Sequence, residues 1–200
     1  MTLWQAAQRA AAGVLLVVTG PLIVALALAI RVDTPGPAFF TGVRVGRGGA
    51  PFRIHKLRTM GWTPDAPGAA ITSHADPRVT RIGRFIRQTH LDELPQLWDV
   101  VRGEMLLVGP RPEAPEYVDL QDDRWRRILA VRPGITGPTQ LAFRDEARLL
   151  DHSDPDATYR SLLLPAKMES DLAYVERRTW RTDIEWLGRT WMSLRDGGPW

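Results

Sequence analysis

The longest apolar stretch of the chain runs from Ala10 to Ile30 without a charged residue and lies between Arg9 and Arg31. One helix needs roughly 20 residues to cross a bilayer, so this stretch is long enough. Gly20-Pro21 lies in its middle, and a proline there removes a backbone hydrogen bond, so the helix is predicted to kink. Two arrangements remain open: a kinked helix that crosses the bilayer, or a re-entrant helix that dips in and returns to the same face.

Positive charge orients this segment, because arginine and lysine are in excess on cytoplasmic flanks. Only Arg9 and the amino terminus precede it, whereas many basic residues follow it closely, so its C-terminal side is predicted to be cytoplasmic. We expect a re-entrant membrane helix over residues 1–31 and a cytosolic domain over residues 32–200 packed on the membrane surface. The alternative, a buried helix of a soluble core, is rarely so apolar over this length. The basic residues that follow are Arg31, Arg44, Arg47, Arg53, Lys56 and Arg58.

Residues 42–60 alternate between apolar and polar positions on both sides of a glycine turn, which predicts a β-hairpin. Side chains at every second position of a strand share one face, so Phe52, Ile54, Lys56 and Arg58 are predicted to do so. Two cations spaced in this way at a strand end can converge on one anion. A solvated strand end is the other interpretation.

The remaining apolar periodicity is mostly helical, which predicts an α+β fold that is largely helical with one small hairpin or sheet. The segments are a loop at 62–76, an amphipathic helix at 80–90, a second helix marked by Leu94, Leu97, Trp98 and Val101, a short buried strand at 105–109, and a basic helix with a Pro-Gly turn at 124–137.

The C-terminal region has a further set of apolar residues at helical spacing, which form one stripe on a predicted helix and are flanked by arginines. A basic helix with tryptophans on its apolar face is typical of a helix lying on a membrane surface. Ordinary core packing would explain the stripe as well, and the apolar N-terminal segment favours the interfacial interpretation. The stripe consists of Trp180, Ile184, Leu187, Trp191 and Leu194.

Composition narrows the chemistry more than the class of fold. The net charge is +3, and among 26 basic residues only Lys56 and Lys167 are lysines. Arginine matches phosphate and carboxylate with a planar fork of donors. The chain has no cysteine, which excludes disulfides and thiolate sites. The standard phosphate-loop, dinucleotide, zinc-protease and serine-hydrolase motifs are absent, and no basic face is clustered enough to predict nucleic-acid binding.

Two adjacent carboxylates, Asp92 and Glu93, precede the second helix. Pro95 costs little within the first turn of a helix, so the helix is predicted to begin near Asp92 or Glu93, with Asp92 as its N-cap. The N–H groups of a first turn favour carboxylates and nearby phosphate. Arg87 and Arg111 are candidates to hold such a phosphate.

An Asp beside a Glu can supply a nucleophile together with a ligand for a hard cation such as Mg²⁺. A capped surface helix is the other interpretation, and the pair taken alone favours it. The choice between them therefore depends on the sequence around the pair.

That surrounding sequence resembles a known family. The chain is similar to the bacterial sugar transferases that are monotopic polyprenyl-phosphate phosphoglycosyl transferases, in their minimal form. The resemblance extends from the apolar stretch almost to the C-terminus. It is carried by DTPGPAFF, RVGRGGAPFRIHKLRTM, TRIGRFIRQTHLDELPQLWDVVRGEMLLVGPRPE, RPGITGPTQL, YRSLLLPAKMESDLAYV and DIEWLGRT.

The resemblance implies transfer of a phosphosugar from a UDP-sugar to undecaprenyl phosphate, which yields UMP and a polyprenyl-diphosphate sugar. It implies that Asp92 attacks the phosphorus and becomes an aspartyl-phosphosugar, while Glu93, with Asp92, binds Mg²⁺. It also implies a monotopic protein of the bacterial inner membrane whose site faces the cytoplasm. The substrate-binding residues that it implies are Lys56, Arg58, Arg87, Arg111 and Pro112, with Arg132 and Thr136 at the nucleotide end.

Two positions depart from the family pattern. The family commonly has Ser-Pro in its membrane helix, where this chain has Gly20-Pro21, and often Ser where this chain has His90. His90 could replace a helix cap or add a titrating group near the site. A catalytically silent scaffold of the same fold is the alternative function, although it would have no need to keep the acidic pair and its cations. The sequence does not specify the sugar, and it leaves the oligomeric state open, a homodimer included.

Overall fold

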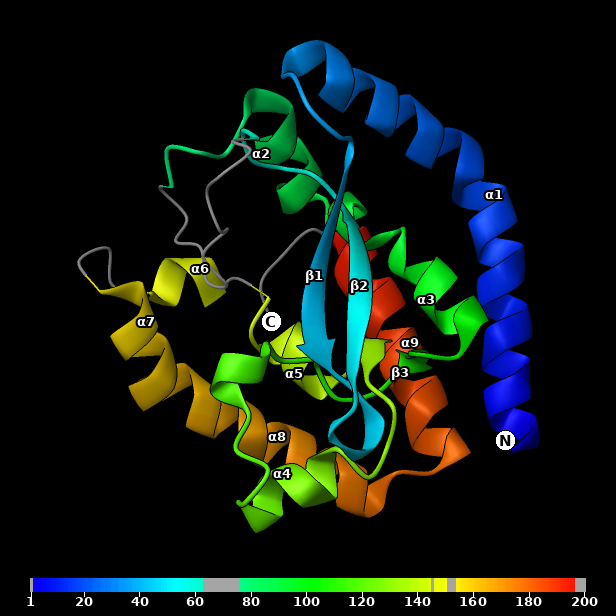
Figure 1. Ribbon diagram of the computed structural model, residues 1–200. Helices are drawn as coiled ribbons and strands as arrows, with labels where there is room; N and C mark the ends of the chain where they lie inside the picture. The colour runs from blue at the N-terminus through cyan, green and yellow to red at the C-terminus, as the bar shows by residue number, and fades with distance from the viewer. Residues whose placement is uncertain (1, 63–75, 145, 151–153, 197–200) are drawn as a thin grey trace.

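The computed structural model describes residues 2–62, 76–144, 146–150 and 154–196. The predicted loop at 62–76 therefore lies almost entirely outside the described residues. The predicted α+β class is confirmed (Figure 1). The elements are α1 (Leu3–Asp33), β1 (Phe39–Val45), η1 (Arg47–Gly49), β2 (Pro51–Leu57), α2 (Arg81–Gln88), η2 (Leu91–Glu93), α3 (Gln96–Arg102), β3 (Leu106–Val108), η3 (Pro115–Tyr117), α4 (Asp123–Ile128), β4 (Gly134–Thr136), α5 (Pro138–Ala142), α6 (Glu146–Leu149), α7 (Pro155–Thr158), η4 (Tyr159–Leu163), α8 (Leu164–Arg177) and α9 (Trp180–Asp196).

The apolar N-terminal segment forms one continuous helix, α1, which contains Pro21 and bends partway along its length (Figure 1). Thr2 begins it with a capping box, in which the Thr2 side chain accepts a hydrogen bond from the Gln5 N–H. Just before the proline, the Thr19 hydroxyl donates to the Leu15 carbonyl at 2.7 Å. Gly20-Pro21 therefore bends the helix without breaking it into two.

Both ends of α1 pack on the rest of the protein. Near the start, the buried Gln8 side chain accepts hydrogen bonds from the backbone N–H groups of Leu107 and Val108 at 3.0 and 3.2 Å. Near the end, Ile23 and Ile30 are buried in a cluster that also holds Ala38, Leu57 and Ile86. By length and composition α1 could cross a membrane. Only 11% of its most apolar window is buried against the rest of the protein, whereas the core helix of a soluble protein would be mostly buried.

Among the described residues the strands form two small sheets of two strands each. β1 and β2 form the predicted antiparallel hairpin, in which Gly42 pairs with Ile54. β3 pairs in parallel with β4, where the sequence predicted only a Pro-Gly turn. The predicted basic helix is only Asp123–Ile128 (α4), and β4, which follows it in the chain, pairs with β3. A Cβ at Gly134 would overlap the backbone of Gly109, so glycine at 134 reflects this close approach rather than a turn.

The hairpin, α1, α3 and β3 share the main hydrophobic core. Phe52 and Ile54 of β2 pack there with Val100 of α3 and with Met105 and Val108 around β3. This core places the end of β2 next to the turn that precedes α3. A second core, under α4 and α8, contains Val45, Trp125, Ile128, Leu129 and Met168.

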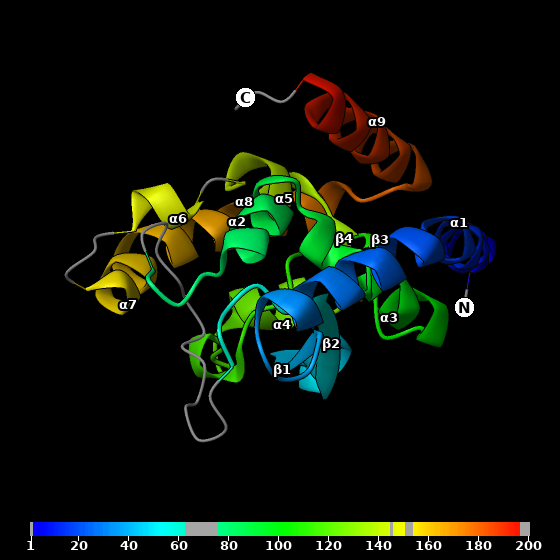
Figure 2. The same ribbon diagram turned by 90° about the horizontal axis from the view of Figure 1, so that it is seen from above.

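The C-terminal helix α9 runs along one edge of the molecule (Figure 2) and has an unusual polarity. Its inward side includes Asp183 and Ser193, whose exposed fractions are 0% and 1%. Its outward side exposes large apolar residues, among them Trp191 at 69%. The predicted stripe is thus directed mostly away from the core, except for the half-buried Leu187. The exposed apolar residues of α9 are Trp180, Ile184, Trp191, Met192 and Leu194.

Candidate active site

The acidic pair lies in the 3₁₀ turn η2, one turn ahead of α3. The predicted helix start is wrong, because α3 begins at Gln96 with Pro95 in the N-cap position, and Asp92 caps no α-helix. The turn instead follows His90, whose φ of 54° is the only positive value among the non-glycine residues that the structure describes. The left-handed conformation of His90 therefore sets the direction in which the turn leaves α2.

Lys56 bridges the two carboxylates. Its ammonium donates to Glu93 Oε1 at 2.7 Å and lies 3.8 Å from Asp92 Oδ2. On the other side of Glu93, the Arg111 guanidinium lies 3.9 Å from the same Oε1. Residues from β2, from η2 and from the turn after β3 thus meet at one point, which brings together Lys56, Glu93 and Arg111, three residues that the family resemblance assigns to the site.

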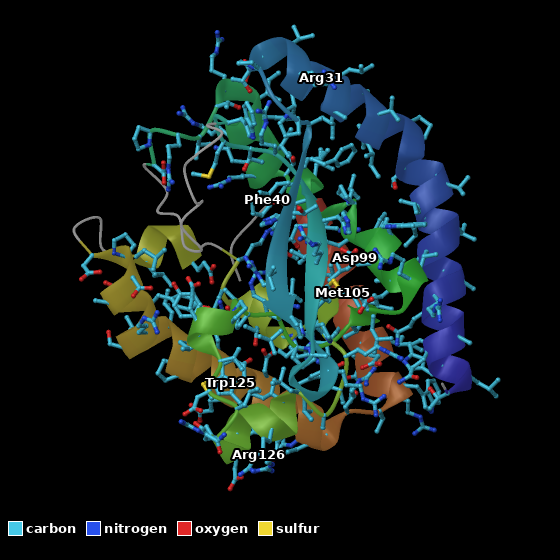
Figure 3. The ribbon with its side chains drawn as sticks, viewed as in Figure 1. Arg31, Phe40, Asp99, Met105, Trp125 and Arg126 are labelled. Carbon is cyan, nitrogen blue, oxygen red and sulfur yellow. The ribbon has the colours of Figure 1, made fainter. Side chains whose placement is uncertain are left out.

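A buried pair attaches the strand that carries Lys56 to α3. Asp99 is fully buried and projects from α3 towards β2 (Figure 3). It accepts a hydrogen bond from the His55 backbone N–H at 3.0 Å, and its other oxygen lies 2.6 Å from His55 Nδ1. Burial raises the pKa of Asp99, although both contacts with His55 oppose that shift. This pair fixes the position of the neighbouring Lys56 relative to the acidic turn.

Arg87 reaches the site from α2. Its Nε donates to the Thr59 hydroxyl at 2.8 Å. Burial lowers the pKa of Arg87, and the negative charge of Asp92 partly offsets this effect. α2 packs against the chain after β2 at Gly83, where a Cβ would overlap the Thr59 carbonyl. The predicted proximity of Arg87 to the acidic pair is therefore present in the fold.

The two carboxylates have opposite electrostatic environments. Burial raises the pKa of Asp92, and the negative charge of Glu93 adds to this effect, while Lys56 and Arg87 oppose it. Burial would also raise the pKa of Glu93, but Lys56 and Arg111 outweigh it and lower that pKa to about 2. Glu93 is therefore the firmly ionised member, and the charge of Asp92 is balanced less completely.

Arg111 lies in a turn that is held from behind by α8. The buried Asp171 accepts hydrogen bonds from the Arg111 backbone N–H at 3.2 Å and from the Thr139 hydroxyl at 2.5 Å. Burial raises the pKa of Asp171 to about 7, and the two hydrogen bonds act in the opposite direction. Asp171 thus fixes the backbone of the turn, and the Arg111 side chain remains directed at Glu93.

A polar cavity opens beside Lys56, Glu93 and Arg111. Much of its wall was not singled out by the sequence analysis. Lys167, only 2% exposed, lies 3.0 Å from Glu113 and 2.9 Å from Glu146, and it donates to the Tyr159 hydroxyl at 2.8 Å. From the sequence, Lys167 is notable only as one of the two lysines of the chain, and no motif predicts its position in a site. Other lining residues are Arg44, Ile54, Gln96, Pro112, Ala114, Tyr117, Gly134 and Ile135.

Gln96 is the most informative of the residues that the sequence analysis missed. It is 2% exposed and lines the polar cavity, and among the residues that the structure describes its side-chain Nε2 finds no hydrogen-bond partner. A buried polar group without a partner is costly, so it calls for an explanation. Gln96 lies three residues after Glu93 and lines the same cavity, so this amide is available to a ligand there.

An apolar groove with a volume of about 390 Å³ adjoins the polar cavity. It extends from Glu93 and Arg111 to Leu15 and Thr19 of α1 and to Leu194 of α9. Glu93 and Arg111 line both spaces, so they form part of the wall between them. The rest of the lining combines apolar residues with polar ones that include His90, Arg144 and Ser193. The apolar residues are Leu91, Leu94, Leu97, Leu107, Ile135, Leu141, Phe143 and Leu187.

Three of the predicted substrate ligands lie apart from this centre. The Arg58 guanidinium, buried just beyond β2, donates to the Thr34 and Pro35 carbonyls at 2.9 and 2.5 Å and so holds the chain after α1. Arg132 lies 3.5 Å from Gln5 at the start of α1. Neither arginine is among the described residues that line the cavity or the groove.

Thr136 lines the groove, where its hydroxyl lies 2.7 Å from that of Thr190. Pro112 does line the polar cavity, as predicted.

The acidic pair offers carboxylate oxygens that suit Mg²⁺. In the part of the chain that the structure describes, no group of three or more acidic or histidine side chains could hold a metal. Mg²⁺ usually takes one or two carboxylates and completes its shell with water and substrate phosphates. Asp92 and Glu93 therefore fit a cation that is shared with a phosphorylated substrate.

Comparison with known proteins places the chain in a family. The model for the bacterial sugar transferase family matches residues 2–196, so the chain belongs to this family. One similar protein is the UDP-glucose:undecaprenyl-phosphate glucose-1-phosphate transferase of Caulobacter vibrioides, which is 39% identical over 188 residues. Another is a UDP-N-acetylgalactosamine-undecaprenyl-phosphate N-acetylgalactosaminephosphotransferase of Aeromonas hydrophila, 37% identical over 183 residues. An uncharacterized sugar transferase of Bacillus subtilis, EpsL, is 34% identical over 173 residues.

These alignments cover most of the chain but not always most of the relative. They include 92%, 88% and 86% of the chain, respectively. They include 66% of the Caulobacter protein, 40% of the Aeromonas protein and 77% of the Bacillus protein. The family is therefore established, and the first two names describe proteins longer than the part that is shared.

Proposed function

We propose that the protein transfers a phosphosugar from a UDP-sugar to a polyprenyl phosphate such as undecaprenyl phosphate. The observation that carries this proposal is the position of Glu93 and Arg111 in the wall between a polar cavity and an apolar groove. One space suits a charged, water-soluble donor, and the other suits a hydrocarbon chain. The relatives from Caulobacter and Aeromonas bear names that combine the same two substrates.

The donor fits the polar cavity. Lys56 and Arg111 lie beside the acidic pair and can bind the diphosphate, because cations that face a phosphorus centre stabilise the charge that develops during transfer. The buried Gln96 amide can donate to an oxygen of the UDP-sugar and so gain the partner that it lacks among the described residues. Glu113 and Glu146 can accept hydrogen bonds from sugar hydroxyls.

Asp92 is the nucleophile in the proposed reaction. Its carboxylate oxygen forms a bond to the phosphorus that carries the sugar, and the bond from that phosphorus to UMP breaks, with its electron pair leaving on UMP. An oxygen of the polyprenyl phosphate then attacks the same phosphorus. The aspartyl–phosphorus bond breaks, which restores the Asp92 carboxylate and releases the polyprenyl-diphosphate sugar. Incomplete balancing of the Asp92 charge leaves its oxygen less stabilised than that of Glu93, which favours attack.

Mg²⁺, held by Glu93 and Asp92, would neutralise phosphate charge at this site. Lys56 already contacts both carboxylates, so it keeps them oriented towards one point. Arg87 adds positive charge near Asp92 from the side of α2. These residues of the chain therefore orient the nucleophile and concentrate positive charge where the phosphoryl group must lie.

A membrane position with the site on the cytoplasmic face supports access to the lipid. Both ends of α1 pack on the remainder of the protein. If α1 spanned the bilayer, its two ends would lie on opposite sides of a hydrocarbon core roughly 30 Å thick. The bend at Pro21 is compatible with a helix that enters and returns. The exposed tryptophans of α9 give the body a second apolar face. We infer a monotopic protein of the bacterial inner membrane.

The reaction can be tested with purified full-length protein, Mg²⁺, undecaprenyl phosphate and a panel of UDP-sugars, by measuring UMP release. We expect one or more UDP-sugars to give repeated turnovers of UMP release only when the lipid is present in excess, whereas the donor alone should release no more than about one UMP per protein. With the donor alone, radiolabelled in the sugar, we expect about one label bound per protein. Asp92→Asn should abolish both signals, since it removes the attacking oxyanion, and chelation of Mg²⁺ should abolish turnover.

Asp119→Asn is a matched control, because Asp119 lies in a surface turn and contacts the Gln121 backbone N–H instead of the site. It should retain the activity of the wild type. Full activity of Asp92→Asn, or the absence of UMP release with every donor, would contradict the proposed mechanism.

A further inference from the structure

The acidic turn is connected to α9 by two residues, His90 and Arg144, which also line the apolar groove but have no assigned role in the proposed reaction. His90, which immediately precedes η2, holds a left-handed backbone conformation at φ 54°. Its Nε2 lies 2.6 Å from the Nε of Arg144, beyond the end of α5. Because arginine can only donate, His90 Nε2 must accept this hydrogen bond. A strained residue is kept in place only by its surroundings, and Arg144 is a part of them.

Arg144 contacts α9 with its other end. Its NH1 donates to the Ser193 backbone carbonyl at 3.0 Å and to the Ser193 hydroxyl at 2.6 Å. Ser193 is 1% exposed, so this contact is shielded from water. A single guanidinium therefore connects the residue before the acidic turn with the inward side of α9.

The same helix presents its apolar residues to the exterior. Trp191 and Met192, which directly precede Ser193, are 69% and 46% exposed. Because residues two apart lie on nearly opposite sides of a helix, the Trp191 side of α9 faces away from the contact between Ser193 and Arg144. A shift of α9 on docking would move the Ser193 carbonyl and, through Arg144, the side chain of His90.

We propose that Arg144 is a positioning residue that couples the seating of α9 on a lipid surface to the turn that carries Asp92. The partner surface is a phospholipid bilayer, and the effect on the reaction rests on the proposed function. Arg144 acts through His90 and does not itself contact the reacting atoms. Its loss should therefore reduce turnover more than substrate affinity.

Arg144→Met tests this directly, since methionine keeps much of the aliphatic stem and removes the donors. In phospholipid vesicles that contain undecaprenyl phosphate, we expect kcat to fall about tenfold with little change in either KM, as a small misplacement of a reacting group can cost that much. His90→Asn tolerates the left-handed backbone but ends short of Arg144, and it should show the same pattern. A rise in KM at unchanged kcat would make Arg144 a substrate ligand and overturn the proposal, as would an unchanged kcat.

Hydrogen exchange provides a readout that does not depend on activity. The amides of Glu93 and Leu94 donate within the turn to His90 and Leu91, both at 3.3 Å, so their exchange reports how firmly the turn is closed. In the wild type, transfer from detergent to vesicles of phosphatidylethanolamine and phosphatidylglycerol should slow this exchange. Arg144→Met should abolish the difference.

Arg189→Met is the matched control, because Arg189 lies on the exposed side of α9, over the Trp186 ring at 4.7 Å. It should keep the vesicle-dependent protection of the turn. Equal protection in Arg144→Met and in the wild type would overturn the coupling even if the protein transfers phosphosugar. Conversely, if no donor yields UMP but the protection depends on Arg144, the proposed function fails while the coupling to the bilayer stands.

Discussion

The ammonium of Lys56 lies 2.7 Å from Glu93 and 3.8 Å from Asp92, so one cation serves both carboxylates. The two contacts differ in length, and Glu93 has Arg111 as a further partner at 3.9 Å. This unequal sharing separates the pKa values of two neighbouring acids. It gives each residue a different expected response to substitution and to pH.

Removing Lys56 should shift the pH dependence of activity. Lys56 lowers the pKa of both Asp92 and Glu93, so Lys56→Met raises both values. Because each carboxylate is needed in its ionised form, the acid limb of the kcat/KM profile should move to higher pH. Arg53→Met, on an exposed position of the same strand, should leave the limb in place. An unmoved limb in Lys56→Met would contradict this role.

Substitution of the two acids should change folding stability in opposite directions. The pKa of Glu93 in the folded protein is lowered from 4.5 to about 2, so its charge stabilises the fold above pH 4.5, and this contribution is lost as pH falls towards 2. Glu93→Gln should therefore lower the free energy of unfolding at pH 7, by on the order of 1–3 kcal/mol.

The pKa of Asp92 is raised in the folded protein, so its ionised form costs stability at neutral pH. Asp92→Asn should raise the free energy of unfolding there while it abolishes transfer. Denaturant unfolding of both variants at pH 7 measures the two signs. The expectation is refuted if both substitutions destabilise equally.

Gln96→Leu should separate stability from binding. Leucine is similar in size and removes a buried amide for which the described part of the chain supplies no partner, so the free energy of unfolding should stay equal or rise. If the amide donates to the UDP-sugar, KM for the donor should rise about tenfold, the value of one hydrogen bond of roughly 1.4 kcal/mol. Gln121→Leu, at an exposed position, is the control and should leave KM unchanged.

Cysteine labelling tests the topology of α1, since the chain has no cysteine of its own. Leu3 is 92% exposed, and Thr41 is exposed in β1. Single cysteines at both positions should react with an impermeant maleimide only after the cytoplasmic side is opened. A cysteine at Val17, which is 77% exposed in the protein alone, should be protected by lipid. Reaction of Leu3→Cys and Thr41→Cys from opposite sides would mean that α1 spans the membrane.

Trp191→Glu should weaken association with phospholipid vesicles at least about tenfold, because an exposed tryptophan on α9 would otherwise be buried in the interface. Val43→Glu, which changes an exposed apolar residue of β1, is the control and should co-sediment as the wild type does. Sedimentation with vesicles measures both. Equal loss in the two variants would argue for a nonspecific effect of charge.

Much of the local structure could be predicted from the sequence, because the periodicity of the side chains matches the elements. The hairpin and α2 follow from alternation and from an amphipathic pattern capped by Thr80, whose hydroxyl accepts from the Gly83 N–H at 2.9 Å. β4 was missed, since Gly134 reads as a turn and its pairing with β3 depends on residues far away in the sequence.

The site was predicted in part, from the family resemblance and from the sequence around the acidic pair. Lys56 and Arg111 converge as expected, whereas Arg58 does not, because β2 ends at Leu57 and the alternation of faces ends with it. Gln96 and Arg144 carried no distinctive pattern. Their roles depend on a buried amide and on a contact with α9, and only the three-dimensional structure reveals these.

The contact at Gly83 leaves room for a hydrogen atom and for nothing larger beside the Thr59 carbonyl. The spacing between α2 and the end of the hairpin is therefore set by two backbones in direct contact, with no deformable side chain between them. Such a junction has no adjustable part. An alanine at position 83 would displace the whole of α2. Arg87, one turn further along this helix, would then move away from the acidic pair.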